Sequence, residues 1–170
     1  MISKIRANWI LIFTSIIIFF NQCGVYSFTG AAIEGKTVNI HFIENQARNI
    51  VPSLSASFTE KLRQRILSQT SLSQINSENT DYDISGYITN YDVTVASIAG
   101  NETSSANRLT ITVLIDYKNK LNPKSNFQQN FSRFADFSAS KNLQSVENQL
   151  IADISDQIVD DIFNKAFVNW

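Results

Sequence analysis

Cys23 is the side chain with the clearest chemistry in this sequence. It is the only cysteine among 170 residues, and it closely follows an uncharged, mostly apolar run at residues 9–20, which itself follows Lys4 and Arg6. A short basic segment and about a dozen apolar residues are the layout of a secretory signal peptide, and the run is shorter than a ~20-residue spanning helix. A cysteine at its end predicts a bacterial lipoprotein signal: the chain is cut before Cys23, which carries an N-acyl diacylglycerol lipid.

Two residues depart from the usual lipoprotein signal. Gln22 stands where a small residue is usual, and Phe20 stands where an aliphatic one is usual. An uncleaved anchor, or a plain secretory peptide with an incidental cysteine, is therefore the alternative interpretation.

The remaining reactive side chains do not assemble into a catalytic or metal site. His41, the sole histidine, falls on the polar side of an expected strand, so no Ser–His–Asp triad or zinc cluster can be composed around it. The few glycines are too scattered for a phosphate loop. The acidic pairs Asp153/Asp156 and Asp160/Asp161 are expected to form a solvated helix stripe. The sequence thus predicts no enzyme, no metal and no cofactor other than the lipid.

Length and charge predict one domain without nucleic-acid binding. We expect a signal peptide at 1–22, a short lipid-proximal lead at 23–36 and a single α+β domain at 37–170. Without Lys4 and Arg6 the mature chain has 12 basic and 15 acidic residues, a net charge of −3. That balance gives no support for general nucleic-acid binding.

Hydrophobic periodicity predicts a two-layer sandwich in the order β-α-β-β-β-α. Strands are expected near 37–42, 82–95, 109–117 and 127–137, and helices from Pro52 and from a cap at Ser140 or Asn142. The apolar parity switches past Asn90, which predicts a bulge in a long strand, and a hairpin-type loop is expected at 100–107. Since each helix has one apolar stripe, both should pack on one face of a four-stranded mixed sheet.

Several segments resemble the LptE family of lipopolysaccharide-assembly lipoproteins, in particular its Bacteroidetes-type members. The similar segments are GVYSFTG (24–30), VNIHFIEN (38–45), LxxxFTEKL (54–62), DISGYITNY (83–91), RLTITV (108–113) and IVDDIFNKAF (158–167), with Trp170. They follow one another in the family's order over nearly the whole mature chain. The resemblance implies a two-layer α/β sandwich that sits inside the outer-membrane β-barrel LptD as a plug, anchored by its lipid on the periplasmic side.

Basic residues are the candidates for direct lipopolysaccharide contact, because that lipid carries phosphates and acidic sugars. Arg108, Lys118, Lys120 and Lys124 lie on the expected third strand and at its two ends. Ordinary solubilising charges or lumen salt bridges are the alternative role for each of them.

Two other functions stay open at this stage. An auxiliary lipoprotein of another transport or outer-membrane assembly machine could share the same sandwich, because a fold does not determine a function. A periplasmic hydrolase would need a convergent polar pocket around His41. Co-purification with a large barrel separates the first of these from the plug role, and a His41→Ala variant tests the second.

Overall fold

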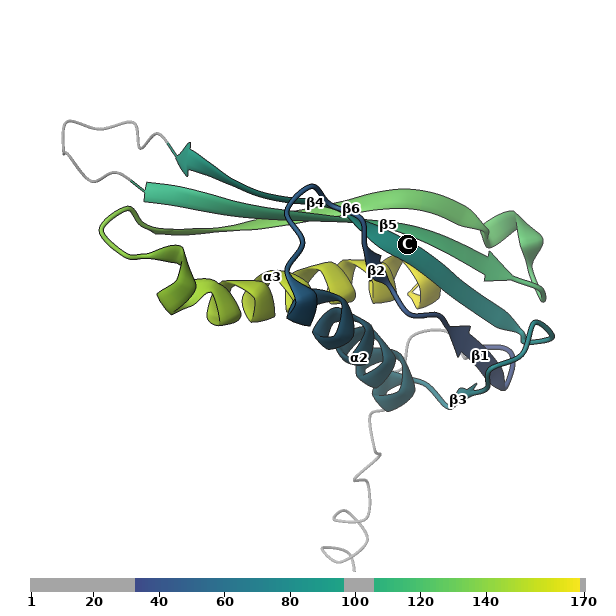
Figure 1. The fold of residues 1–170 in the computed structure, drawn as a ribbon. Helices are drawn as coiled ribbons and strands as arrows, with labels where there is room; N and C mark the ends of the chain where they lie inside the picture. Colours follow the sequence, from purple (N-terminus) through teal and green to yellow (C-terminus); the bar gives the residue numbers. More distant parts are fainter. Residues whose placement is uncertain (1–32, 97–105, 169–170) are drawn as a thin grey trace, which may run out of the picture.

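The computed structural model of the chain, which describes residues 33–96 and 106–168, has one layer of sheet and one layer of helices (Figure 1). Both long helices lie on the same side of the sheet. In chain order the elements are β1 (Thr37–Ile40), β2 (Glu44–Asn45), α2 (Pro52–Gln69), β3 (Ser73–Gln74), β4 (Tyr82–Ala96), β5 (Ala106–Asn119), the 3-10 turn η1 (Pro123–Ser125), β6 (Phe127–Ser138) and α3 (Leu143–Phe167).

The sheet has six strands, so the prediction of four strands was wrong in number and order. Its path runs β3-β1-β4-β5-β6, and β2 pairs with β4 beyond the end of β1. The two additional strands, β2 and β3, have two residues each and lie in polar segments that predicted loops. Strands this short carry no period that a sequence could reveal. The sheet is mixed, as predicted: β1 pairs in parallel with β3 and β4, and β2 pairs in parallel with β4, whereas the β4–β5 and β5–β6 pairs are antiparallel.

The core fills the space between the sheet and the two helices. The apolar positions of the third predicted strand are all buried, namely Leu109, Ile111, Val113, Ile115 and Tyr117. The stripe predicted for the first helix is fully buried at Leu54, Phe58, Leu62 and Ile66. From α3 the core receives Leu150, Ile154, Ile158 and Ile162, while Leu143 and Val146 pack at its margin. The four-residue spacing therefore identified the correct helix faces.

The long strand β4 bends at the predicted place. Its register against β5 shifts between Ile88 and Asn90, so Tyr91 is buried on the helix side although its parity differs from that of Ile84. A single extra residue reverses the side-chain alternation in this way. Strand β5 already begins at Ala106, so the expected loop at 100–107 extended too far into it; residues 97–105 lie outside the described part.

The first strand is shorter than its alternation predicted. β1 ends at Ile40, and Phe42, which the pattern placed in the core, is 57% exposed. Ile43 is buried instead, and its backbone N–H donates to Thr59 Oγ1 at 3.0 Å. The chain leaves the extended conformation after Ile40, so the next buried position falls on the other parity.

A side-chain cap begins the helix α3. The Asn142 side chain accepts a hydrogen bond from the backbone N–H of Gln144 at 3.1 Å, which confirms one of the two predicted caps. This bond satisfies an N–H group that has no partner within the helix.

Candidate functional site

The face of the sheet away from the helices carries mostly small polar side chains. Thr112 on β5 lies between Asn90 on β4 and Ser132 on β6, and its Oγ1 is 2.9 Å from Ser132 Oγ. Thr110 occupies the equivalent place one row away, opposite Asp92. No helix or strand in the described residues covers this surface (Figure 1). We call it the open face.

Three larger side chains interrupt the open face. Tyr87 lies directly opposite Leu114, which places an apolar pair in the middle of the polar rows. Phe134, opposite Thr110, is 50% exposed. Exposed aromatic groups within a polar surface are typical of protein interfaces. Such a mixture of polar rows and isolated apolar groups can bind a partner through many small contacts.

Arg108 is held at one end of the open face. Its Nε and NH2 groups donate to the two Asp136 carboxylate oxygens at 2.7 and 2.9 Å, and its guanidinium carbon lies 3.7 Å from the Phe134 ring centre. The hydrogen bonds from Arg108 lower the pKa of Asp136. A bidentate pair stacked on an aromatic ring leaves Arg108 one exposed edge for an additional acceptor.

Lys118 and Lys120 lie at the opposite end of β5 and line one depression of about 540 Å³. Lys118 Nζ is 3.4 Å from Asp116, and Lys120 Nζ donates to the Glu78 carbonyl oxygen and to Asn79. Ten residue steps separate Arg108 from Lys118, which is ~33 Å along a strand. The fold thus divides the predicted basic group in two.

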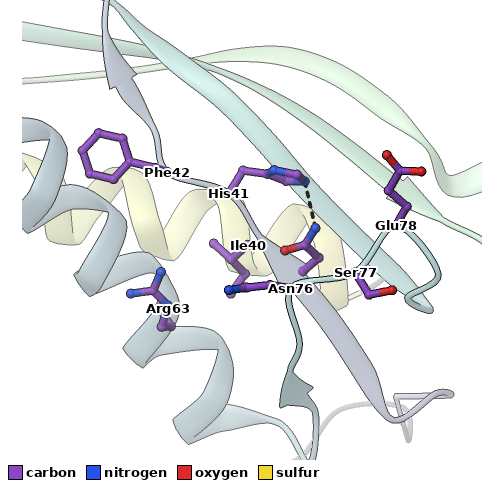
Figure 2. Close-up of a pocket in the computed structure, with 8 residues that line it drawn as sticks. Ile40, His41, Phe42, Arg63, Asn76, Ser77 and Glu78 are labelled. Carbon is purple, nitrogen blue, oxygen red and sulfur yellow. Dashed lines mark hydrogen bonds between the residues drawn. The ribbon is translucent and has the colours of Figure 1, made fainter.

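A neighbouring depression of about 460 Å³ holds the sole histidine (Figure 2). His41 Nε2 lies 2.9 Å from Asp83 Oδ2 and 3.0 Å from Asn39 Nδ2. His41 and Phe42 point in opposite directions, and Arg63 of α2 approaches from the helix layer. His41 also lines the depression that holds the two lysines, so both depressions meet at this residue.

The His41–Asp83 pair does not have the arrangement of a hydrolytic centre. A Ser or Cys nucleophile would need to lie within about 3.2 Å of the imidazole. Among the described residues, the side-chain partners of His41 are Asn39 and Asp83. The described residues also contain no group of three or more His, Cys, Asp or Glu that could hold a metal ion.

The acidic face of α3 is exposed as expected at Asp153 and Asp156, but three of its four predicted carboxylates also form ion pairs. Asp156 pairs with Lys61, Asp160 Oδ1 lies 2.7 Å from Arg65 NH2, and Asp161 Oδ2 lies 2.6 Å from Arg133 Nε. Two of these pairs join α3 to α2, and the third joins α3 to the edge strand β6. Sequence reasoning missed them because their partners come from other elements.

A match to a protein-family model assigns the chain to a family. The model described as "LptE: Lipopolysaccharide-assembly" matches residues 35–166, far more than half of the sequence. The chain belongs to the LptE family. It is therefore a lipopolysaccharide-assembly lipoprotein of the Gram-negative envelope, and the predicted resemblance is confirmed.

Solved structures support the LptE fold. A minor lipoprotein from Acinetobacter baumannii superposes with a TM-score of 0.55 and 12% identity, covering 81% of this chain and 96% of that one. An uncharacterized lipoprotein B from Nitrosomonas europaea gives a TM-score of 0.54 and 14% identity over 83% and 88% of the two chains. No curated protein sequence matches the chain significantly. At these identities the two structures establish a shared fold.

The predicted LptE residues occupy three separate places. Cys23 lies outside the described residues, and none of the described helices is long and apolar enough to cross a membrane. Lys118, Lys120 and Lys124 belong to one end of the sheet, where Lys124 is an exposed residue of η1, whereas Arg108 lies at the other end. The exposed Tyr87 and Phe134 were not predicted as site residues. Their parity, opposite to that of the core positions, was the available signal.

Proposed function

We propose that this LptE-family lipoprotein is anchored at the periplasmic side of the outer membrane through Cys23 and plugs the lumen of an LptD-like β-barrel. The observation that supports this proposal most is the open face: a sheet surface with Thr, Ser and Asn rows and with charged groups such as Asp92 and Asp116, over which no described element lies. The inner wall of a large membrane barrel is polar, so a plug needs a polar surface to match it.

The lead between Cys23 and the domain is compatible with such a plug. Ten residue steps separate Cys23 from Ile33, the first described residue, and ten extended residues span at most ~35 Å. An acylated Cys23 in the inner leaflet of the outer membrane would therefore keep the domain at the periplasmic mouth of a barrel. The role is one of assembly and needs no catalytic group in the chain.

Two regions are the candidate lipopolysaccharide contacts. Lys118 and Lys120, which line one depression, form the first together with Lys124 of the adjacent turn η1, and Arg108 with its stacked Phe134 forms the second. At ~33 Å apart, the two cannot hold one phosphate group together. We therefore propose that they contact separate parts of the lipid along its path, and that Arg108 acts as a preorganised guanidinium held by Asp136.

Site-specific photo-crosslinking tests the plug role. A photoreactive residue replaces Thr110, Thr112 or Ser132 on the open face, or Gln64 on the exposed side of α2 as the matched control. The expected result is a crosslink from the three open-face positions to a large outer-membrane barrel, identified by mass spectrometry. The Gln64 position should give a much weaker product.

Each alternative outcome has a defined meaning. If the open face crosslinks to subunits of another envelope machine, the LptD-like partner is wrong, and the chain is an auxiliary lipoprotein there. If Gln64 crosslinks to the barrel as strongly as Thr112 does, the open face is not the surface that meets the lumen.

A further inference from the structure

The turn that follows β5 presents an apolar side chain between two lysines. Leu121 is 47% exposed, with Lys120 directly before it and Lys124 three residues after it. The Asn119 side-chain oxygen accepts hydrogen bonds from the backbone N–H groups of Leu121 and Asn122, at 2.9 and 3.0 Å. The turn is thus held in one shape by its own side chains, and about half of the Leu121 side chain stays exposed while its Cδ1 lies beside Gly35.

The chain enters the domain beside this turn. A Cβ atom on Gly35 would stand 3.0 Å from Leu121 Cδ1, and Gly35 has a φ of 104° that favours glycine. The hydroxyl of Tyr82 donates to the carbonyl oxygen of Glu34, which fixes the entering segment against β4. The backbone N–H of Lys120 also donates to Asp81 O at 2.9 Å. The end of the sheet that holds Leu121 is therefore the end nearest to Cys23 in the chain.

Charge at this end is concentrated on the turn itself. Lys124 is exposed and forms no ion pair with any residue in the ranges 33–96 and 106–168, and Lys120 binds the Glu78 carbonyl oxygen instead of a carboxylate. Lys36 adds a positive charge nearby. The carboxylate of Asp81 is occupied by the backbone N–H groups of Lys36 and Thr37, at 2.8 and 3.0 Å. The acidic groups at this end are Glu34, Glu78, Asp81 and Asp83, and Asp83 lines the same depression as Lys118 and Lys120, so any attraction to an anion is local to the lysines of the turn.

We propose that the turn of residues 120–124 docks on anionic phospholipid headgroups of the leaflet that holds the Cys23 lipid, with Leu121 entering the interface. An apolar tip flanked by lysines suits this boundary, where the side chain enters the acyl region and the ammonium groups stay at headgroup level. Each lysine near an anionic surface strengthens attraction roughly fivefold. This contact rests on the proposed acylation of Cys23, and it holds this end of the sheet beside the leaflet that carries the lipid.

Tryptophan fluorescence in vesicles tests the contact. The chain is processed and acylated in its host, which removes Trp9 with the signal peptide. It carries Trp170→Phe together with Leu121→Trp, and is reconstituted into phosphatidylglycerol-containing vesicles with brominated acyl chains. We expect blue-shifted emission and strong bromine quenching. Ile50→Trp is the matched control, because Ile50 is 68% exposed but lies between β2 and α2, away from this turn. Its fluorescence should be quenched little.

Charge reversal distinguishes membrane contact made by the turn from membrane anchoring by the Cys23 lipid. Lys120→Glu with Lys124→Glu should reduce the quenching of Leu121→Trp to the Ile50→Trp level, while flotation with the vesicles persists through the lipid. Loss of flotation in the parent chain would instead refute the acylation of Cys23. Equal quenching of both tryptophans would overturn the docking proposal, and so would quenching that requires lipopolysaccharide in the vesicles, because the occupant would then be the transported lipid. Photo-crosslinking from Thr112 to the barrel tests the proposed plug role separately, so failure of the docking proposal can be distinguished from failure of the plug role.

Discussion

The two faces of the sheet are built from alternate residues of the same strands, yet only one of them forms a core. On β5, Ile111 is fully buried against the helices, whereas the next residue, Thr112, bonds to Ser132 on the open face. The helix side meets the matching apolar stripes of α2 and α3. The open side meets nothing in the described residues.

This difference shows that one alternating pattern determines both the face of the sheet that the helices cover and the face that stays open. The apolar parity specifies which face the helices of this chain must cover. The polar parity specifies a surface that needs no cover for folding, because Thr, Ser and Asn can bond to water or to each other. A partner that uses the open face can therefore bind without contributing to the stability of the isolated domain.

Arginine substitutions at the two neighbouring residues Ile111 and Thr112 should give the largest difference in stability. Ile111→Arg would bury an unpaired charge in the core, and a loss above about 4 kcal/mol should leave the domain unfolded. Thr112→Arg should change the free energy of unfolding by about 0.5 kcal/mol. Urea unfolding followed by circular dichroism measures both, and barrel co-purification of the folded Thr112→Arg variant then tests the open face. A folded, cooperative Ile111→Arg variant would contradict the two-face description.

Gly86 tests how closely the two central strands must approach. A Cβ atom at this position would stand 2.1 Å from the backbone oxygen of Leu114, and backbone atoms cannot turn aside as a side chain can. Gly86→Ala should cost about 1–3 kcal/mol of unfolding free energy, towards the upper end of that range. Ser85→Ala, the neighbouring substitution, is the control and should cost much less. Thermal unfolding of the two variants compares them, and equal midpoints would argue against the close approach.

The regular elements could be predicted because their signals are local. The helix stripes of Phe58 and Ile154, the alternation around Ile111 and the parity switch past Asn90 all lie within single segments. Phe42 was misplaced because its strand ends two residues earlier than the alternation does. The strands β2 and β3 could not be found, since a two-residue strand exists only through its pairing with a distant partner.

The candidate site was less predictable than the fold. Arg108 and Lys118 looked like one basic group in the sequence, but a strand of this length separates its ends by ~33 Å. The carboxylates of α3 looked solvated, but Asp160 and Asp161 meet arginines from α2 and β6. Such pairings depend on how elements pack against one another, which hydrophobic periodicity does not determine.

The ion pairs on the helix layer should contribute less than either sheet face. Arg65 and Asp160 approach to 2.7 Å, with side chains that are 39% and 49% exposed, and the Arg65 guanidinium lies 5.6 Å from the Phe163 ring centre. Exposed pairs of this kind contribute about 0.2–1 kcal/mol. A double-mutant cycle with Arg65→Met and Asp160→Asn measures the coupling energy. A value well above that range would mean that the pair determines how α2 and α3 pack.

The smallest expected effect concerns the entry of the chain into the sheet, and it disappears in acid. Hydrogen bonds from the Lys36 and Thr37 backbone lower the pKa of Asp81 below its ordinary value of 3.8. A lowered folded-state pKa stabilises the protein above the unfolded-state pKa, and this contribution disappears as the pH falls through the folded value. Asp81→Asn should therefore be less stable than the parent chain at neutral pH, and the two should converge as the pH falls below 3.8 and through the lowered folded-state pKa. Unfolding midpoints measured across this range test the prediction. Thr37→Val is a second comparison: it removes the side-chain donor to the Asp81 carboxylate and also the acceptor of the Asp81 backbone N–H, so part of its loss should not depend on pH. A constant difference between the two chains at every pH would show that Asp81 acts through its shape and not through its charge.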